Sequence, residues 1–311
     1  MTTALITHPA CLDHVTPPGH PERVARLEYI LDALSGPEFA TLQRETAPLV
    51  ADDDLLRIHP KAYVQAIRDA SPQSGFVSLD ADTHMSPGSL EEALRGAGAQ
   101  TRAIDLVLDG EVQNAFCAVR PPGHHAERQT AMGFCLFGNV ALGAKYAIAH
   151  HGLSKVAIVD FDVHHGNGTQ DLVEEDPNIL FVSTHQSPLY PGTGAAHETG
   201  VANNVLNLPL PSGTGSAEYR RVFDTYVAPK VRAFSPELLI ASAGFDAHVM
   251  DPLASLELTT EDFGWVTERL CNLAAELCEG RLVSNLEGGY DLDALAESTA
   301  AHVRVLMERG A

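Results

Sequence analysis

The stretch VAIVDFDVHHGNG, residues 156–168, runs from an unbroken apolar segment straight into acids and histidines. Such an apolar run is typical of a strand that is buried on both faces of a parallel sheet. Asp160, Asp162 and His164 alternate with apolar residues, so an extended backbone places their side chains on one face. Carboxylate and imidazole groups at a strand end predict half of a metal site. A hydrogen-bonded polar cluster in a loop is the alternative at this point.

Similar apolar runs recur along the chain and alternate with helical patterns. We expect strands over 4–7, 115–119, 155–160, 179–184, 205–208, 238–243 and 282–286. We expect helices over 21–34, 89–108, 139–150, 216–233, 259–278 and 292–307. No internal repeat or linker-like change of composition interrupts this alternation. The pattern predicts an α/β fold in which residues 1–311 form a single domain, a doubly wound and mostly parallel β-sheet flanked by helices.

The composition suits a globular protein with a substantial core. The 311 residues are 45% hydrophobic and 20% charged, with a formal net charge of −21. This charge argues against direct nucleic-acid binding, which needs a basic surface. It favours cationic ligands such as lysine side chains or polyamines, although an acidic surface also simply increases solubility.

The cysteines and the first residues bear on the cellular compartment. Five scattered cysteines without a Cys-x-x-Cys pair favour a reducing compartment and no disulfide framework. The opening MTTALITHPACLDH lacks the basic and long apolar segments of a signal peptide. No apolar run approaches the roughly 18 residues of a membrane span. We therefore expect a cytoplasmic protein without a membrane partner.

Polar, glycine-rich segments follow five of the expected strands. They are RPPGHH (120–125), DFDVHHGNG (160–168), HQSPLYPGTG (185–194), GFDAH (244–248) and EGGYDL (287–292). Parallel strands of a doubly wound sheet end at a common edge, where such folds bind ligands. The convergence of five segments predicts one shared site there, more strongly than any single motif does.

A three-ligand metal site can be assembled from these segments. A catalytic zinc typically has three protein ligands and an open position for water or substrate. Asp162 and His164 supply two candidates from one strand end, and Asp246 in GFDAH is the natural third. A turn residue or helix cap is the alternative interpretation of Asp246.

Groups suited to proton transfer and oxyanion binding lie on two other segments. His124 and His125 follow the rigid turn Pro-Pro-Gly and can exchange protons near neutral pH, although such a pair alone is ordinary surface sequence. Tyr290 follows two glycines, and its hydroxyl can donate to a developing oxyanion. A core tyrosine is the alternative.

Taken together, the motifs resemble the histone deacetylase-type zinc amidohydrolases, in particular class II-like and bacterial-type members of the arginase/deacetylase superfamily. The matching blocks are GHPERVARL (19–27), RPPGHHA (120–126), GFCLFGNVA (133–141), VDFDVHHGNGTQ (159–170), STHQSPLYPGTG (183–194), AGFDAH (243–248) and LEGGYDL (286–292). They cover nearly the whole chain in family order. The resemblance implies the arginase/deacetylase fold and a zinc-dependent hydrolase of linear amides.

The resemblance also implies roles for individual residues. The zinc ligands are Asp162, His164 and Asp246. His125 matches the general base that takes a proton from the metal-activated water, and His124 its electrostatic partner and possible proton donor. Tyr290 matches the residue that polarises the scissile carbonyl. His165 has no direct catalytic role.

Further residues match positions that support this chemistry. Asp160 matches the carboxylate that orients His124 and, with Ser183 and the carbonyls of Asp162, His164 and Thr184, binds a structural potassium ion. Asn167 stands where class I members carry an aspartate. An amide orients an imidazole without stabilising its charge, so His125 is expected to be the less basic histidine.

The resemblance further implies a narrow substrate tunnel formed by Gly133, Phe134, Tyr190, Leu253 and Gly288. Leu253 matches a rim position that is apolar in many lysine deacetylases and a glutamate in the polyamine-selective relative. Asp80 or Asp82 in the loop LDADT (79–83) could anchor a peptide backbone or an amine. We therefore expect removal of acetyl or other acyl groups from acylated lysine. An acetylpolyamine or small-amide deacetylase and a non-catalytic binding module remain the alternatives.

Overall fold

A single parallel sheet organises the chain. The computed structural model describes residues 2–310. Its sheet has the strand order β2-β1-β5-β10-β9-β6-β7-β8, and every adjacent pair is parallel. The strands are β1 (Thr3–Thr7), β2 (Gln43–Thr46), β5 (Asn114–Cys117), β6 (Val156–Asp160), β7 (Ile179–Gln186), β8 (Val205–Leu210), β9 (Leu238–Ala243) and β10 (Leu282–Leu286). This architecture confirms the predicted α/β fold.

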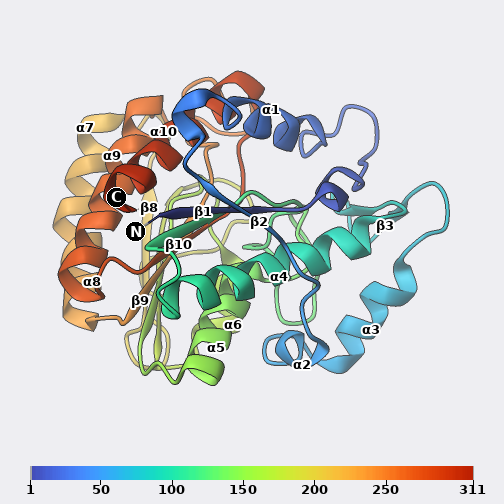
Figure 1. Ribbon diagram of the computed structural model, residues 1–311, viewed down its shortest axis with the longest axis horizontal. Helices are drawn as coiled ribbons and strands as arrows, with labels where there is room; N and C mark the ends of the chain where they lie inside the picture. Colours follow the sequence, from blue (N-terminus) through green and yellow to red (C-terminus); the bar gives the residue numbers. More distant parts are fainter. Residues whose placement is uncertain (1, 311) are drawn as a thin grey trace.

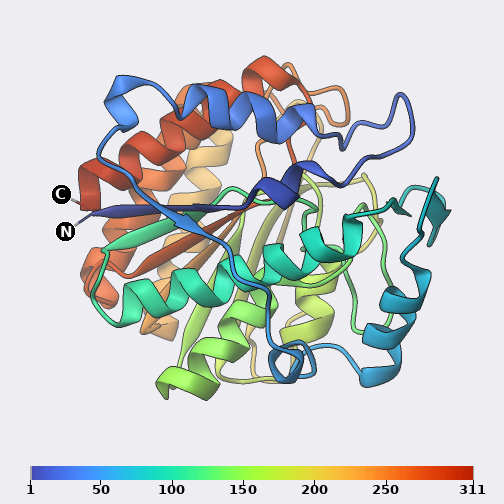
Figure 2. The ribbon, with the colours of Figure 1, turned by 45° about the vertical axis from the view of Figure 1, so that its right-hand side comes forward.

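Helices cover both faces of the sheet (Figures 1 and 2). On one face α1 (Ala25–Ala33), α9 (Thr260–Leu277) and α10 (Leu292–Gly310) lie together, whereas α4 (Ser89–Leu108), α5 (Asn139–His151) and α6 (Asn167–Val173) lie on the other. The remaining elements are α2 (Asp52–Leu55), α3 (Lys61–Ala70), α7 (Ser216–Val222), α8 (Ala228–Phe234) and the small antiparallel pair β3 (Val77–Ser78) and β4 (His84–Met85). Two 3₁₀ turns span Pro9–Leu12 and Pro37–Phe39.

The central strands are buried on both faces. Every residue of β5, β6, β7, β9 and β10 is buried, which agrees with the largely apolar segments from which these strands were predicted. Edge strand β2 differs, because its sequence is QRET and its residues alternate between half-buried and exposed. An apolar-run criterion does not detect such a strand, and β2 was missing from the prediction.

Two predicted helices differ from those in the structure for identifiable reasons. The helix expected from residue 21 begins at Ala25, because the Glu22 carbonyl accepts hydrogen bonds from the Thr16 hydroxyl (2.6 Å) and the His20 ring (2.9 Å). That carbonyl is therefore engaged outside the helix. The helix expected over 216–233 contains a π-helical turn, Phe223–Val227, just before Pro229, which has no N–H to donate.

The sheet order brings the predicted site segments together. The neighbouring strands β5, β10, β9 and β6 occupy the middle of the sheet, and each is followed by one of the polar segments.

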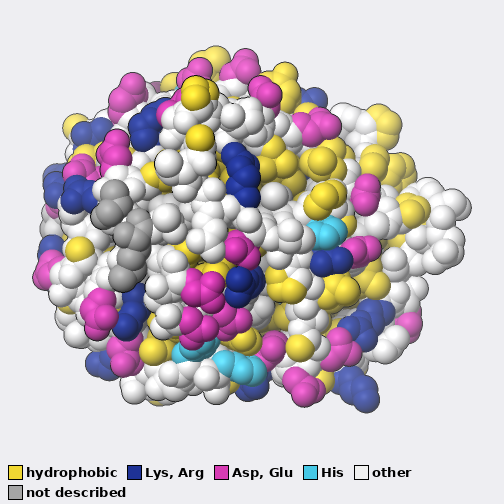
Figure 3. Space-filling model, in the orientation of Figure 1, with side chains coloured by type: hydrophobic (Ala, Val, Ile, Leu, Met, Phe, Trp, Pro, Cys, Tyr) yellow, Lys and Arg dark blue, Asp and Glu magenta, His cyan; other side chains and the backbone are white. Residues whose placement is uncertain are grey.

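None of the helices in the described part of the chain combines the length and apolar character that a membrane crossing requires. On the face drawn in Figure 3, Lys and Arg are interspersed with acidic side chains.

Candidate active site

Three predicted metal ligands converge at the ends of two adjacent strands. Asp162 and His164 follow β6, and Asp246 follows β9, its hydrogen-bonded neighbour. All three are buried, and their ligand atoms lie within 4.8 Å of one another. His164 Nδ1 is 3.1 Å from an oxygen of Asp162 and 3.1 Å from an oxygen of Asp246. The side chains therefore form one compact cluster, although Asp246 lies more than 80 residues after the other two in sequence.

Backbone amides hold the two carboxylates in position. Asp162 accepts hydrogen bonds from the amides of His164 (2.8 Å) and Gly288 (2.8 Å), and Asp246 accepts one from Val163 (2.9 Å). A Cβ at residue 288 would lie 2.1 Å from Asp246 Oδ2 and 2.5 Å from Asp162 Oδ2. Only glycine fits there. Gly288 thus packs beneath the ligand cluster and is not one of the residues that line the cavity above it.

The electrostatics of this cluster suit a divalent cation. Burial lowers the pKa of His164, but its hydrogen bonds to Asp162 and Asp246 outweigh burial and raise the pKa to about 10. Two buried carboxylates thus draw positive charge into the cluster. Two oxygen donors and one imidazole nitrogen are a ligand set that zinc accepts, with a further position left open.

The histidine pair lies beside this cluster, and its two members have opposite environments. His124 Nδ1 is 3.0 Å from Asp160, and the charges of Asp162 and Asp160 overcome burial to raise the pKa of His124 to about 10. His125 Nδ1 is 2.7 Å from the Asn167 amide oxygen. Burial and the positive charges of His124 and His164 hold the pKa of His125 well below its usual value. The less basic histidine is therefore the one that faces an amide.

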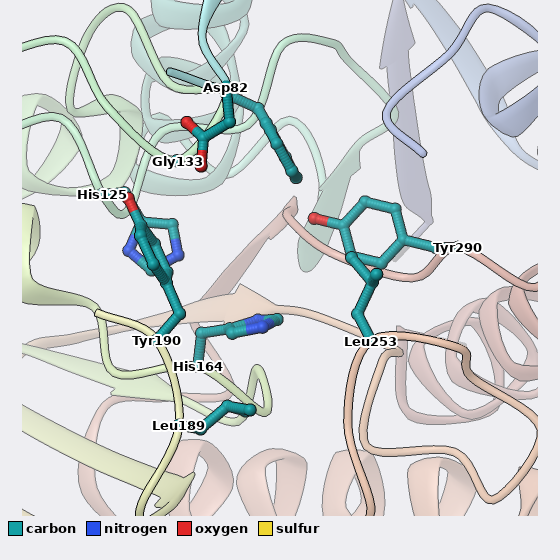
Figure 4. A pocket seen from close by; sticks show the side chains of 9 residues that line it. Asp82, His125, Gly133, His164, Leu189, Tyr190, Leu253 and Tyr290 are labelled. Atoms are coloured by element: carbon teal, nitrogen blue, oxygen red, sulfur yellow. The ribbon is translucent and has the colours of Figure 1, made fainter. Parts of the chain in front are cut away.

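A cavity of about 230 Å³ opens above the cluster (Figure 4). Its lining residues are Asp82, His125, Gly133, Phe134, His164, Leu189, Tyr190, Leu253 and Tyr290. The Tyr290 hydroxyl points into it (Figure 4), and the rings of Phe134 and Tyr290 lie 5.9 Å apart. A Cβ at residue 133 would lie 2.4 Å from the His125 ring, so glycine is required there as well. The cavity is a narrow aromatic passage with titratable groups at its base.

The structure distinguishes Asp80 from Asp82, which the sequence left equivalent. Asp80 Oδ1 accepts hydrogen bonds from the amides of Asp82 (3.0 Å) and Thr83 (2.6 Å) and thereby shapes its own loop. Asp82 lines the cavity mouth, where burial and the charge of Asp80 raise its pKa. Leu189 also lines the cavity, although its sequence context gave no sign of this.

The residues assigned to potassium are neighbours on adjacent strands. Asp160 of β6 pairs in register with Ser183 of β7, and both are fully buried. Asp160 Oδ1 accepts the Asp162 amide at 3.0 Å, and Ser183 Oγ lies 2.9 Å from His185 Nδ1. His165 lies nearby and bonds to Thr193 (2.8 Å) and Gln170 (3.0 Å), away from the cavity lining.

Sequence reasoning missed a fully buried arginine that holds the Tyr290 loop. Arg26 Nε donates to the carbonyl of Gly289 (2.6 Å), and its Nη2 donates to the carbonyl of Glu287 (2.5 Å). Its guanidinium lies 4.9 Å from the centre of the Tyr290 ring. Glu22 pairs with Arg26 at 3.1 Å and also with buried Arg120. The spacing Glu-x-x-x-Arg is an ordinary exposed pair in most helices, so it carried no signal.

Two buried acids complete this support. Glu287 accepts hydrogen bonds from the amides of Gly123 (2.7 Å) and His124 (3.1 Å), which fixes the turn that carries the histidine pair. Asp251 Oδ2 accepts the amide of Tyr290 at 2.7 Å. The amides of Gly123, His124 and Tyr290 lie 39 or more positions away in sequence from the acids that accept from them, and no local pattern marks these three bonds.

We expect Arg26→Lys to lower kcat by about tenfold while KM stays within about twofold of wild type, because lysine keeps the charge but cannot donate to two carbonyls in a fixed fork. Steady-state kinetics of the wild-type protein and the variant measure this. The matched control is Arg304→Lys on α10, whose guanidinium packs over Phe39 far from the cavity. Equal activity of Arg26→Lys and the control would contradict the positioning role.

Comparison with known proteins identifies the family. The Histone deacetylase domain matches residues 20–306. The chain belongs to the histone deacetylase family. It is 41% identical over 308 residues to Histone deacetylase 10, chloroplastic, of Oryza sativa subsp. japonica, covering 93% of this chain and 70% of the rice protein. It is 41% identical over 286 residues to the Histone deacetylase-like amidohydrolase of Pseudomonas aeruginosa, covering 89% of this chain and 74% of that protein.

A solved structure of the histone deacetylase family agrees with the fold. The crystal structure of the HDA15 HD domain superposes with a TM-score of 0.92 at 35% identity, covering 99% of this chain and 89% of that chain. Membership of the histone deacetylase family supports a deacetylase or amidohydrolase activity. The family match confirms the resemblance inferred from the motifs.

Proposed function

We propose that this chain is a zinc-dependent deacylase that removes acetyl or other acyl groups from acylated lysine. One observation carries the proposal: the three-ligand cluster, His125 and the Tyr290 hydroxyl meet at the base of one apolar passage. Asp162, His164 and Asp246 would hold the zinc ion. When bound, zinc would supply Lewis-acid chemistry and lower the pKa of water.

The side chains of this chain have complementary tasks in the proposed reaction. His125 faces the cavity and takes the proton of the attacking water, and the low pKa of its ring keeps it unprotonated beforehand. The Tyr290 hydroxyl donates a hydrogen bond to the carbonyl oxygen as negative charge develops there. His124, held cationic by Asp160 and Asp162, stabilises that charge and is the candidate donor to the leaving amine.

A monovalent cation is the second proposed cofactor. Asp160 and Ser183, with the carbonyls of Asp162, His164 and Thr184, would bind potassium beneath the histidine pair. Support comes from the register pairing of Asp160 with Ser183 and from their complete burial. Bound there, the ion would offset the carboxylate charge that Asp160 places next to His124.

The shape of the cavity supports an acyl-lysine substrate. Phe134, Leu189, Tyr190 and Leu253 give the passage apolar walls, along which a lysine methylene chain can pack. A steady-state comparison of the purified protein on acetyl-lysine peptides, longer acyl-lysines and N-acetylated polyamines tests the proposal. We expect peptide turnover to dominate. Polyamine turnover that exceeds peptide turnover by about 100-fold would replace the proposal with the acetylpolyamine alternative.

The rim residue Leu253 offers a sharper test of substrate class. We expect Leu253→Glu to raise kcat/KM for N-acetylated polyamines about tenfold and to lower it for acetyl-lysine peptides, because a carboxylate at the mouth attracts a second amine. Leu253→Gln is the control that keeps the size without the charge. If both variants change kcat/KM for the two substrates equally, the residue at 253 does not select substrates by charge.

A further inference from the structure

A series of hydrogen-bonded side chains, His125–Asn167–Glu127, extends behind His125 on the side away from the substrate cavity. The Asn167 amide oxygen is 2.7 Å from His125 Nδ1, and the Asn167 amide nitrogen donates to Glu127 Oε1 at 2.8 Å. The same nitrogen lies 3.4 Å from Met132 Sδ, a second acceptor. Asn167 is buried, whereas Glu127 is half-buried. Three side chains thus run in series from the candidate base to a carboxylate.

The donors and acceptors of these three side chains allow only one orientation of the Asn167 amide and one tautomer of His125. An ionised carboxylate accepts hydrogen bonds and does not donate, so the group of Asn167 that faces Glu127 must be its NH₂. The amide oxygen therefore faces His125, and since it too only accepts, His125 Nδ1 must carry the ring proton. In a neutral imidazole the lone pair is then on Nε2. That nitrogen is the one on the cavity side.

We propose that Glu127 is a positioning residue that sets the tautomer of His125 through Asn167, so that the base presents an unprotonated Nε2 to the reacting water. The inference rests on the proposed hydrolytic function. Glu127 touches neither the substrate cavity nor the ligand cluster, and acts only through the Asn167 side-chain amide. Asn167 alone could turn over and present its NH₂ to the ring, and the carboxylate prevents this.

Charge reversal tests the relay. In Glu127→Lys the ammonium donates, so the Asn167 oxygen turns toward it and the NH₂ faces His125, which moves the lone pair to Nδ1. We expect kcat to fall by about 100-fold with KM and zinc content retained. Adding Asn167→Asp supplies a carboxylate that accepts from both the lysine and His125. The kcat of the double variant should recover to within about tenfold of the wild-type value.

Two controls separate this relay from a structural effect. Glu127→Gln keeps an acceptor and should stay within about fivefold of wild type. Glu174→Lys makes the same charge change in the same 150 Å³ polar cavity without touching Asn167 and should stay within about twofold. A Glu127→Lys protein as active as the Glu174→Lys control overturns the proposal. So does a double variant no better than the single one when both are folded and zinc-loaded.

The tautomer itself can be observed without any variant. Long-range ¹H–¹⁵N correlation spectra of the histidine-labelled wild-type protein should show His125 protonated at Nδ1, whereas protonation at Nε2 would contradict the relay. This measurement needs no turnover. A wild-type protein that is inactive on every acyl-lysine and acetylpolyamine tested, yet shows the Nδ1 proton, would refute the proposed function while supporting the relay.

Discussion

Tyr290→Phe is expected to lower kcat by about 100- to 1,000-fold, the typical cost of removing one donor to a developing oxyanion. Its hydroxyl points into the cavity, and the ring is fixed by the Arg26 guanidinium and by the Asp251 bond to the Tyr290 amide. Phenylalanine keeps those contacts. The loss should therefore appear in kcat, with KM and zinc content unchanged, in steady-state assays on an acetyl-lysine peptide.

Tyr146→Phe is the matched control for this variant. Tyr146 is a half-buried tyrosine on α5 whose hydroxyl bonds to Asp105 at 3.0 Å, remote from the cavity. Its variant should stay within about twofold of wild type. Near-wild-type turnover by Tyr290→Phe on an amide substrate would mean that the hydroxyl does not stabilise the oxyanion. The proposed mechanism would then lose the one protein group assigned to polarise the carbonyl beside zinc.

Asp246→Asn is expected to abolish stable zinc binding and, with it, activity. The amide preserves the acceptor for the Val163 N–H but removes one of two charges that face His164. Zinc affinity should drop by more than about 100-fold, beyond the loss typical of residues that only support a ligand. Metal analysis after dialysis against a weak chelator measures this directly, and turnover should fall in parallel.

Thermal unfolding gives a second readout for Asp246→Asn. Burial and the charge of Asp162 raise the pKa of Asp246, which shows that two carboxylates repel in this cluster. Zinc should therefore raise the Tm of the wild-type protein clearly and that of Asp246→Asn little. Asp105→Asn, which alters an acid that pairs with His151 outside the site, is the control. Full zinc occupancy of Asp246→Asn would remove Asp246 from the ligand set.

The central strands and the ends of the best-patterned helices were predictable from the sequence. Strands β9 and β10 and helix α4 match their predicted bounds, and α9 begins where a capping box formed by Thr259 and Asp262 ends the preceding segment. In these elements local pattern and tertiary environment agree. Strand β2 and the start of α1 depended instead on an edge pairing and on side chains that engage the Glu22 carbonyl.

The sequence by itself determined the fold class, the family and the residue types at the strand ends. Motifs are local, and a parallel sheet brings the ends of its strands to one edge whatever their order along the chain. Only the tertiary structure decided which side chains touch: Arg26 with the Tyr290 loop, Glu287 with the histidine turn, Asp82 rather than Asp80 at the mouth, and Glu127 with Asn167. The hydrogen bonds among these contacts join positions 40 to 263 residues apart, and hydrogen bonds across such separations depend on packing that no local pattern encodes.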